Sequence, residues 1–98
     1  MSILINAETT FIVQGITGRE AVSLTRENLD YGAKIVGGVT PGRAGRDVYG
    51  VPVFDCVRDI TTKTNVDGSV VCVPPRFTKD AVFEAIENGI KIIVIVTE

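Results

Sequence analysis

The chain has 98 residues, enough for one domain with a single core. An apolar fraction of 45% and a charged fraction of 22% are typical of a globular protein, and a net charge of −2 predicts neither a nucleic-acid partner nor an anionic membrane. The longest apolar run, residues 90–96, contains Lys91 and is too short to cross a bilayer. The N-terminal segment lacks the basic region of a signal peptide, so we expect a cytoplasmic protein.

The residue inventory limits the chemistry available to this chain. It contains no histidine, and its two cysteines, Cys56 and Cys72, fit no CxxC spacing. We therefore expect reduced, structural thiols and no metal site.

The first elements are expected to be a strand, a tight turn and a helix. Residues 3–5 predict a short edge strand, and the β-branched and aromatic residues 10–14 predict the first core strand. A glycine turn follows at 15–18, and good helix formers predict a helix over 19–30. Gly32 then occupies the position that commonly ends a helix.

A second strand is expected over residues 34–40, although Gly37 and Gly38 weaken it. Paired glycines inside a strand indicate the close approach of another backbone or of a ligand. Residues 41–50 are rich in glycine and arginine and predict a loop.

The third strand is expected over residues 51–54, and Pro52 places it at the sheet edge because proline cannot donate to a ladder. Asp55 predicts the N-cap of a helix over 56–63. The remaining elements are expected to be a buried strand over 68–73, a loop over 74–76, a helix over 79–88 capped by Thr78 and ended by Gly89, and a last strand over 90–96.

Strands that alternate with helices of about a dozen residues predict right-handed crossovers and a parallel sheet. We therefore expect an α/β fold: a single doubly wound, Rossmann-like domain with a five-stranded, mainly parallel sheet in the order 3-2-1-4-5. Its ligand crevice should lie at the carboxyl ends of the strands, around the first strand. Three loops should meet there, at residues 15–20, 40–46 and 73–77.

The glycine turn at the start of the first helix is typical of a phosphate site. The first amides of a helix have no intrahelical acceptor, and the helix dipole favours negative charge. Gly15 and Gly18 leave no Cβ to hold a ligand away, and Thr17 adds a hydroxyl donor. A purely structural turn is the alternative interpretation.

The pattern around this turn argues against NAD. The third and sixth positions of a G-x-G-x-x-G motif would be Thr17 and Glu20, and the second strand ends in Val39-Thr40-Pro41 with no acid for the ribose. Arg43 and Arg46 instead suit an additional ribose phosphate, which leaves NADP or coenzyme A. Either arginine could also be merely solvated.

Four segments of the sequence are distinctive: Gly15-Ile16-Thr17-Gly18, residues 34–42, residues 50–54 and residues 95–98. They resemble the CoA-binding N-terminal domain of the succinyl-CoA synthetase (succinate–CoA ligase) α subunit over essentially the whole chain. Gly-Gly-Val-Thr-Pro-Gly at 37–42 is the most specific of these matches. Arg43 stands where the family usually has lysine. With the turn and loop residues above, the resemblance implies a coenzyme A site made of Gly15, Thr17, Gly18, Arg19, Glu20, Thr40, Pro41, Arg43, Val73, Pro74, Val96, Thr97 and Glu98.

The resemblance also implies a place in a nucleoside-diphosphate-forming ligase of the tricarboxylic acid cycle. Family α subunits continue into a second domain with a phosphorylated histidine and work with a nucleotide-binding β subunit. A chain without histidine should therefore bind coenzyme A but be catalytically incomplete alone. The alternatives are a free-standing CoA-binding or CoA-sensing module and, less favoured, an NADP-binding domain.

Overall fold

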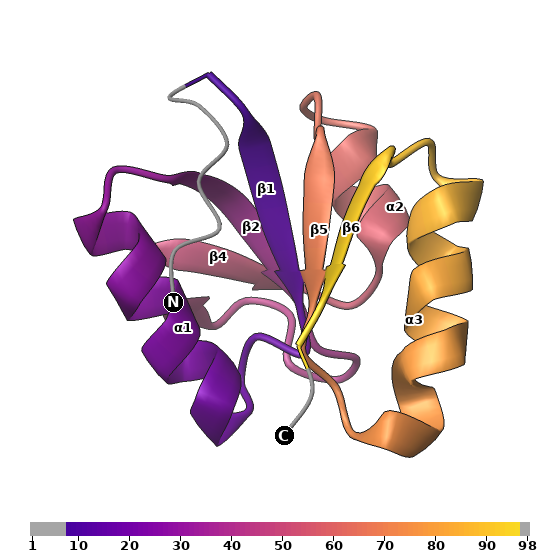
Figure 1. Ribbon diagram of the computed structural model, residues 1–98, viewed down its shortest axis with the longest axis horizontal. Helices are drawn as coiled ribbons and strands as arrows, with labels where there is room; N and C mark the ends of the chain where they lie inside the picture. The colour runs from indigo at the N-terminus through magenta and orange to yellow at the C-terminus, as the bar shows by residue number, and fades with distance from the viewer. Residues whose placement is uncertain (1–7, 97–98) are drawn as a thin grey trace.

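The computed structural model describes residues 8–96 and shows a six-stranded sheet in the order β3-β4-β2-β1-β5-β6 (Figure 1). The elements are β1 (Thr10–Gln14), α1 (Arg19–Asp30), β2 (Lys34–Val39), β3 (Asp47–Val48), β4 (Val51–Phe54), α2 (Val57–Thr61), β5 (Gly68–Val71), α3 (Pro75–Glu87) and β6 (Ile92–Ile95). The expected strand over residues 3–5 lies outside the described residues.

Helices cover both faces of the sheet, as expected for a doubly wound fold (Figure 1). Because strand side chains alternate between faces, Phe11 and Val13 pack in one cluster with Ala21 and Leu24 of α1. Ile12 belongs to a second cluster that contains Val57 and Ile60 of α2 and Ala85 of α3. The central strand β1 is thus buried on both sides, and its carboxyl end lies between the two layers of helices.

The expected order of five parallel strands is confirmed, since β4-β2-β1-β5-β6 corresponds to 3-2-1-4-5 and each neighbouring pair is parallel. The sixth strand corrects the expected loop over 41–50. β3 forms an antiparallel hairpin with β4 through Tyr49 and Gly50, whose φ angles are 51° and 85°. Pro52 therefore does not lie in an edge strand, because β3 flanks β4 on the side away from β2.

Helix α1 has the expected bounds, and both α1 and α3 end next to the glycines that were expected to end them. Gly32 and Gly89 each have a positive φ, and the amides of the following residues reach back to close the last helical turn: Ala33 donates to Asn28, and Ile90 donates to Ala85. The strands are shorter than expected, because β2 ends at Val39, β5 ends at Val71 and β6 covers only Ile92–Ile95.

Two helix starts differ from the expectation. α2 has Cys56, not Asp55, at its N-cap, and is only five residues long. α3 begins at Pro75, with Pro74 at the N-cap, so the expected loop is the first helical turn and Thr78 lies within the helix. Proline suits the first helical position because its fixed φ matches the helix and the amide it lacks would have no partner there.

The paired glycines of β2 make room for side chains, not for a ligand or another backbone. A Cβ on Gly38 would lie 2.4 Å from the Ile16 side chain, and one on Gly37 would lie 2.9 Å from the Ile60 side chain. Ile16 and Ile60 are both buried. Because neither position has a Cβ, the turn after β1 and helix α2 can pack closely against β2.

Candidate functional site

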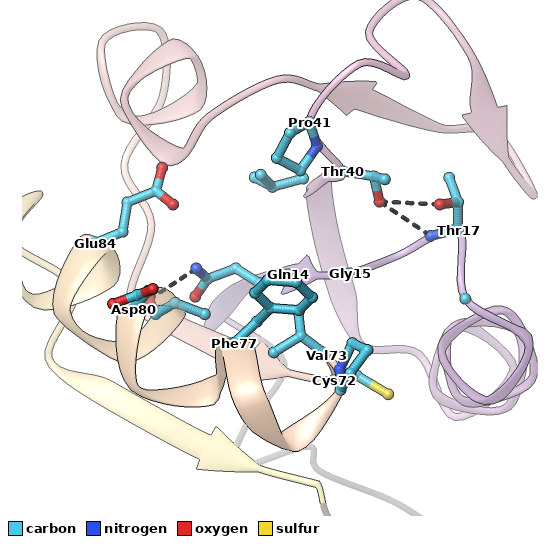
Figure 2. Close-up of a pocket in the computed structure, with 14 residues that line it drawn as sticks. Gln14, Gly15, Thr17, Thr40, Pro41, Cys72, Val73, Phe77, Asp80 and Glu84 are labelled. Carbon is cyan, nitrogen blue, oxygen red and sulfur yellow. Dashed lines mark hydrogen bonds between the residues drawn. The ribbon is translucent and has the colours of Figure 1, made fainter.

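The carboxyl ends of β1, β2 and β5 border a cavity of about 580 Å³, which we call the first lobe. Figure 2 shows that its lining comes from the turn after β1, the end of β2, the β5–α3 corner and one side of α3. The lining residues are Gln14, Gly15, Thr17, Gly18, Val39, Thr40, Pro41, Cys72, Val73, Pro74, Phe77, Asp80, Ala81 and Glu84.

A second lobe of about 450 Å³ adjoins the first and shares Gly18, Cys72, Val73 and Pro74 with it. The remaining lining residues are Arg19, Glu20, Ala21, Pro75, Thr78 and Val96. Gly18 and the β5–α3 corner therefore mark the junction of the two lobes, and the start of α1 lies at this junction.

The turn between β1 and α1 is built around Gly15. Its φ of 85° and its amide hydrogen bond of 2.6 Å to the Val39 carbonyl hold the turn against β2. A Cβ at this position would lie 2.4 Å from the Cys72 carbonyl oxygen, so only glycine fits. The turn then closes through an amide hydrogen bond of 3.0 Å from Gly18 to the Gly15 carbonyl.

The start of α1 leaves amide donors at the junction of the lobes. Gly18 is the N-cap, and among the described residues no side chain caps this helix end. The first helical bond runs from the Val22 amide to the Gly18 carbonyl. The preceding amides of Arg19, Glu20 and Ala21 therefore have no acceptor within the helix, and these three residues line the second lobe.

Two threonines join the turn to the end of β2. The Thr17 amide lies 3.3 Å and its hydroxyl 3.1 Å from the Thr40 hydroxyl oxygen (Figure 2). One hydroxyl hydrogen of the pair is used in this contact, so one remains as a donor for a ligand. Thr17 thus contributes to the site partly by fixing Thr40.

Gln14, which was not among the predicted site residues, lines the first lobe. Its side-chain oxygen accepts a 2.6 Å hydrogen bond from the Ser69 hydroxyl. Its side-chain nitrogen donates a 2.9 Å bond to the Ala81 carbonyl (Figure 2). Gln14 is 2% exposed. This polar residue at the end of a buried strand links β1 to both β5 and α3.

Helix α3 supplies an acidic wall to the first lobe. Asp80 and Glu84 are one helical turn apart, and the Phe77 ring lies beside them in the lobe (Figure 2). A Glu84 carboxylate oxygen accepts a 2.8 Å hydrogen bond from the Val57 amide and so caps α2 from a neighbouring element. Carboxylates on this wall disfavour phosphate there and leave the start of α1 as the better place for anions.

Of the predicted site residues, most line one or both lobes. These are Gly15, Thr17, Gly18, Arg19, Glu20, Thr40, Pro41, Val73, Pro74 and Val96. Arg43 and Arg46 do not line either lobe; both lie in the exposed loop that follows Pro41. Thr97 and Glu98 lie outside the described residues.

The residues that sequence reasoning missed lie mainly on α3, although Asp80, Ala81 and Glu84 all fall within the helix expected over 79–88. Moving the helix start to Pro75 puts Phe77, Asp80, Ala81 and Glu84 on one side at helical spacing, which is a signal the sequence did contain. Gln14 gave another signal, since a long polar side chain ends an otherwise apolar strand.

Within residues 8–96, no group of three or more histidine, cysteine or acidic side chains is placed to hold a metal ion. Cys56 and Cys72 are both partly buried. None of the helices described is long and apolar enough to span a bilayer.

Comparison with solved structures shows the fold. A Rex-family repressor has a TM-score of 0.77 at 18% identity, over 90% of this chain and 52% of that chain. A conserved hypothetical protein from Pyrococcus furiosus has a TM-score of 0.74 at 21% identity, over 90% of this chain and 74% of that chain. These likenesses place the domain among Rossmann-type folds.

Comparison with sequences shows the family. The model of the CoA binding domain matches residues 6–98. Subunit alpha 1 of the ADP-forming succinate–CoA ligase of Archaeoglobus fulgidus is 47% identical over 98 residues, 100% of this chain and 34% of that protein. The alpha subunit from Aquifex aeolicus is 42% identical over 100% of this chain and 32% of that protein. A subunit of an ADP-forming sulfoacetate–CoA ligase from an Acholeplasma species is 46% identical over 100% of this chain and 33% of that protein.

The chain spans about a third of the length of these relatives. Its sequence, the family match and the glycine turn at the start of α1 agree with one another. The chain therefore belongs to the CoA-binding domain family, in the form found in succinate–CoA ligase α subunits.

Proposed function

We propose that this chain binds coenzyme A across the two lobes, with the pyrophosphate at the start of α1. The observation that carries the proposal is the position of this helix end: its uncapped first turn lies at the junction of the lobes, where Gly18 leaves room for phosphate oxygens. Coenzyme A is long and bears phosphate near its middle, so a junction between two lobes suits its shape.

The charges around the two lobes support the same orientation of coenzyme A. Two acidic residues, Asp80 and Glu84, line the first lobe, whereas one basic and one acidic residue, Arg19 and Glu20, line the second. Phosphate groups should therefore avoid the α3 wall, and an uncharged, hydrogen-bonding part of the ligand should lie against it. Arg43, beyond Pro41, is proposed to reach the 3′-phosphate, because a guanidinium suits an additional ribose phosphate.

We further propose that the chain acts as the CoA-binding part of an ADP-forming or related acid–thiol ligase. Relatives that share over 40% identity across this whole chain are named as ligase subunits for two different acids, succinate and sulfoacetate. The specificity for the acid should therefore be determined by residues other than those that these relatives share with this chain. A histidine-bearing domain and a nucleotide-binding partner would supply the phosphoryl chemistry.

Titration of the ¹⁵N-labelled chain with coenzyme A tests the binding site. We expect saturable chemical-shift changes at the amides of Arg19, Glu20 and Ala21, because these should donate to the pyrophosphate. The amides of Asn65 and Asp67 serve as controls, since they border a different cavity. Changes confined to the control amides, or no saturable change at all, would contradict the proposal.

A further inference from the structure

The loop after β2 has an unusual property: every backbone amide it contains has an acceptor. The pairs are Thr40 to the Phe54 carbonyl, Gly42 and Ala44 to the Asp55 carboxylate, Arg43 to the Thr40 carbonyl, Gly45 to the Val53 carbonyl and Arg46 to the Arg43 carbonyl. Pro41 has no amide hydrogen. The loop therefore has no backbone donor left for an anion, and only its side chains can bind one.

One side chain supports this loop at its centre. A single carboxylate oxygen of Asp55, Oδ1, accepts from the Gly42 amide at 2.8 Å and from the Ala44 amide at 3.3 Å. These two amides flank Arg43 on either side. Asp55 was expected to cap α2, but the Val57 amide of that helix is bound by Glu84. Asp55 is thus committed to the loop.

The rest of the loop is held by main-chain bonds to β4. The Gly45 amide donates to the Val53 carbonyl at 3.1 Å, and the Val53 amide donates to the Arg46 carbonyl at 2.9 Å. By contrast, the Gly42 and Ala44 amides on either side of Arg43 are held by a side chain, that of Asp55. Removing that side chain should free this segment while the hairpin and the sheet persist.

We infer that Asp55 is a positioning residue for Arg43: it fixes the backbone on both sides of Arg43 so that the guanidinium can meet the 3′-phosphate of coenzyme A. This inference rests on the proposed function. A long, flexible arginine side chain binds an anion more tightly when its backbone is already fixed, because less freedom is lost on binding. Asp55 acts through hydrogen bonds to amides, so its role requires an acceptor oxygen and not a negative charge.

The test compares the affinities for coenzyme A and dephospho-coenzyme A in three variants. Asp55→Ala should lower the preference for coenzyme A by about tenfold, near the lower limit for the loss of a hydrogen bond to a charged group. Asp55→Asn keeps the acceptor oxygen and should restore most of the preference. Asp47→Ala is the matched control: its carboxylate accepts a 3.1 Å bond from the Gly50 amide in the hairpin and does not touch the Arg43 segment.

Amide hydrogen exchange provides an independent measurement without ligand. In Asp55→Ala the Gly42 and Ala44 amides should exchange faster, whereas the Gly45 amide, which is bound to Val53, should not. Equal loss of affinity for both ligands in Asp55→Ala, or an unchanged preference, would overturn the inference. If the unaltered chain bound neither ligand, the proposed function itself would fail.

Discussion

Gly15 and Gly18 lie three residues apart in one turn, yet a side chain would have different effects at the two positions. At Gly15 the positive φ and the Cys72 carbonyl oxygen at 2.4 Å exclude any Cβ. At Gly18 the backbone is extended, with φ −68° and ψ 152°, and the nearest atom to a Cβ is the Gly15 carbonyl oxygen at 3.4 Å. Gly15 is thus required for folding, whereas Gly18 can be substituted without strain.

Gly18→Val should therefore abolish coenzyme A binding in a folded protein. The added side chain would fill the junction of the two lobes, where the pyrophosphate is proposed to lie. Isothermal titration calorimetry measures the affinity, and circular dichroism checks the fold. Gly15→Val is the contrasting variant, because it should lower the free energy of unfolding as well. Unchanged affinity in a folded Gly18→Val protein would exclude the turn as the phosphate site.

Arg43→Ala tests the second charged contact. If the guanidinium binds the 3′-phosphate, the variant should lose about 1.5–3 kcal/mol of affinity for coenzyme A and none for dephospho-coenzyme A. Arg26→Ala is a suitable control, since this exposed residue of α1 lines neither lobe. A variant that keeps the full preference would show that Arg43 is a solvated surface residue.

At the scale of elements, the site depends on how four of them are joined by hydrogen bonds near one end of the sheet. Gln14 at the end of β1 bonds to Ser69 of β5 and to the Ala81 carbonyl of α3. Glu84 of α3 bonds to the first amide of α2. These polar links bring the side of α3 against the carboxyl ends of the strands and so define the first lobe.

Gln14→Leu should lower the free energy of unfolding by about 1–3 kcal/mol, because the buried Ser69 hydroxyl would lose its partner. Urea denaturation measures the change. Ser69→Ala added to Gln14→Leu should recover part of the loss, since it removes the unpaired hydroxyl. Strictly additive effects of the two substitutions would show that the bond contributes little.

The sequence allowed the parallel sheet, its order and α1 to be predicted because these follow from local patterns and from the handedness of crossovers. The β3–β4 hairpin was not predicted because only the second position of its turn, Gly50, is a glycine; the first is Tyr49, a residue type that rarely adopts a positive φ. The start of α3 was misplaced because two prolines were interpreted as a break. The expected helix over 79–88 already contained Asp80, Ala81 and Glu84, but its sequence did not show which side would face the ends of the strands. The glycine turn was recognisable as a candidate phosphate site from its place between a strand and a helix, together with the other distinctive segments.

At the scale of the whole molecule, the chain has a cavity of two lobes but no imidazole. Its two cysteines differ in position: Cys72 lies at the junction of the lobes, and Cys56 occupies the N-cap position of the short helix α2 and lines neither lobe. A phosphoryl group that must move between sites needs a nucleophile that is neutral near pH 7, a role that suits histidine.

The 98-residue chain should therefore take up no covalent label from γ-labelled ATP or GTP, with or without succinate and coenzyme A. Turnover should appear only when a histidine-bearing ligase domain and a nucleotide-binding partner are added. Autoradiography of the denatured chain measures the label directly. A labelled band at the mass of this chain would reveal a phosphoryl carrier other than histidine.

The proposal that this groove binds coenzyme A is tested most directly by calorimetric titration of the chain with coenzyme A, dephospho-coenzyme A and NADP under identical conditions. All three ligands carry a pyrophosphate, so the comparison separates recognition of coenzyme A from binding of any phosphate at a helix start. We expect saturable binding with one site per chain, tightest for coenzyme A, weaker for dephospho-coenzyme A and weakest for NADP. Tighter binding of NADP, or no binding of coenzyme A, would contradict the assignment.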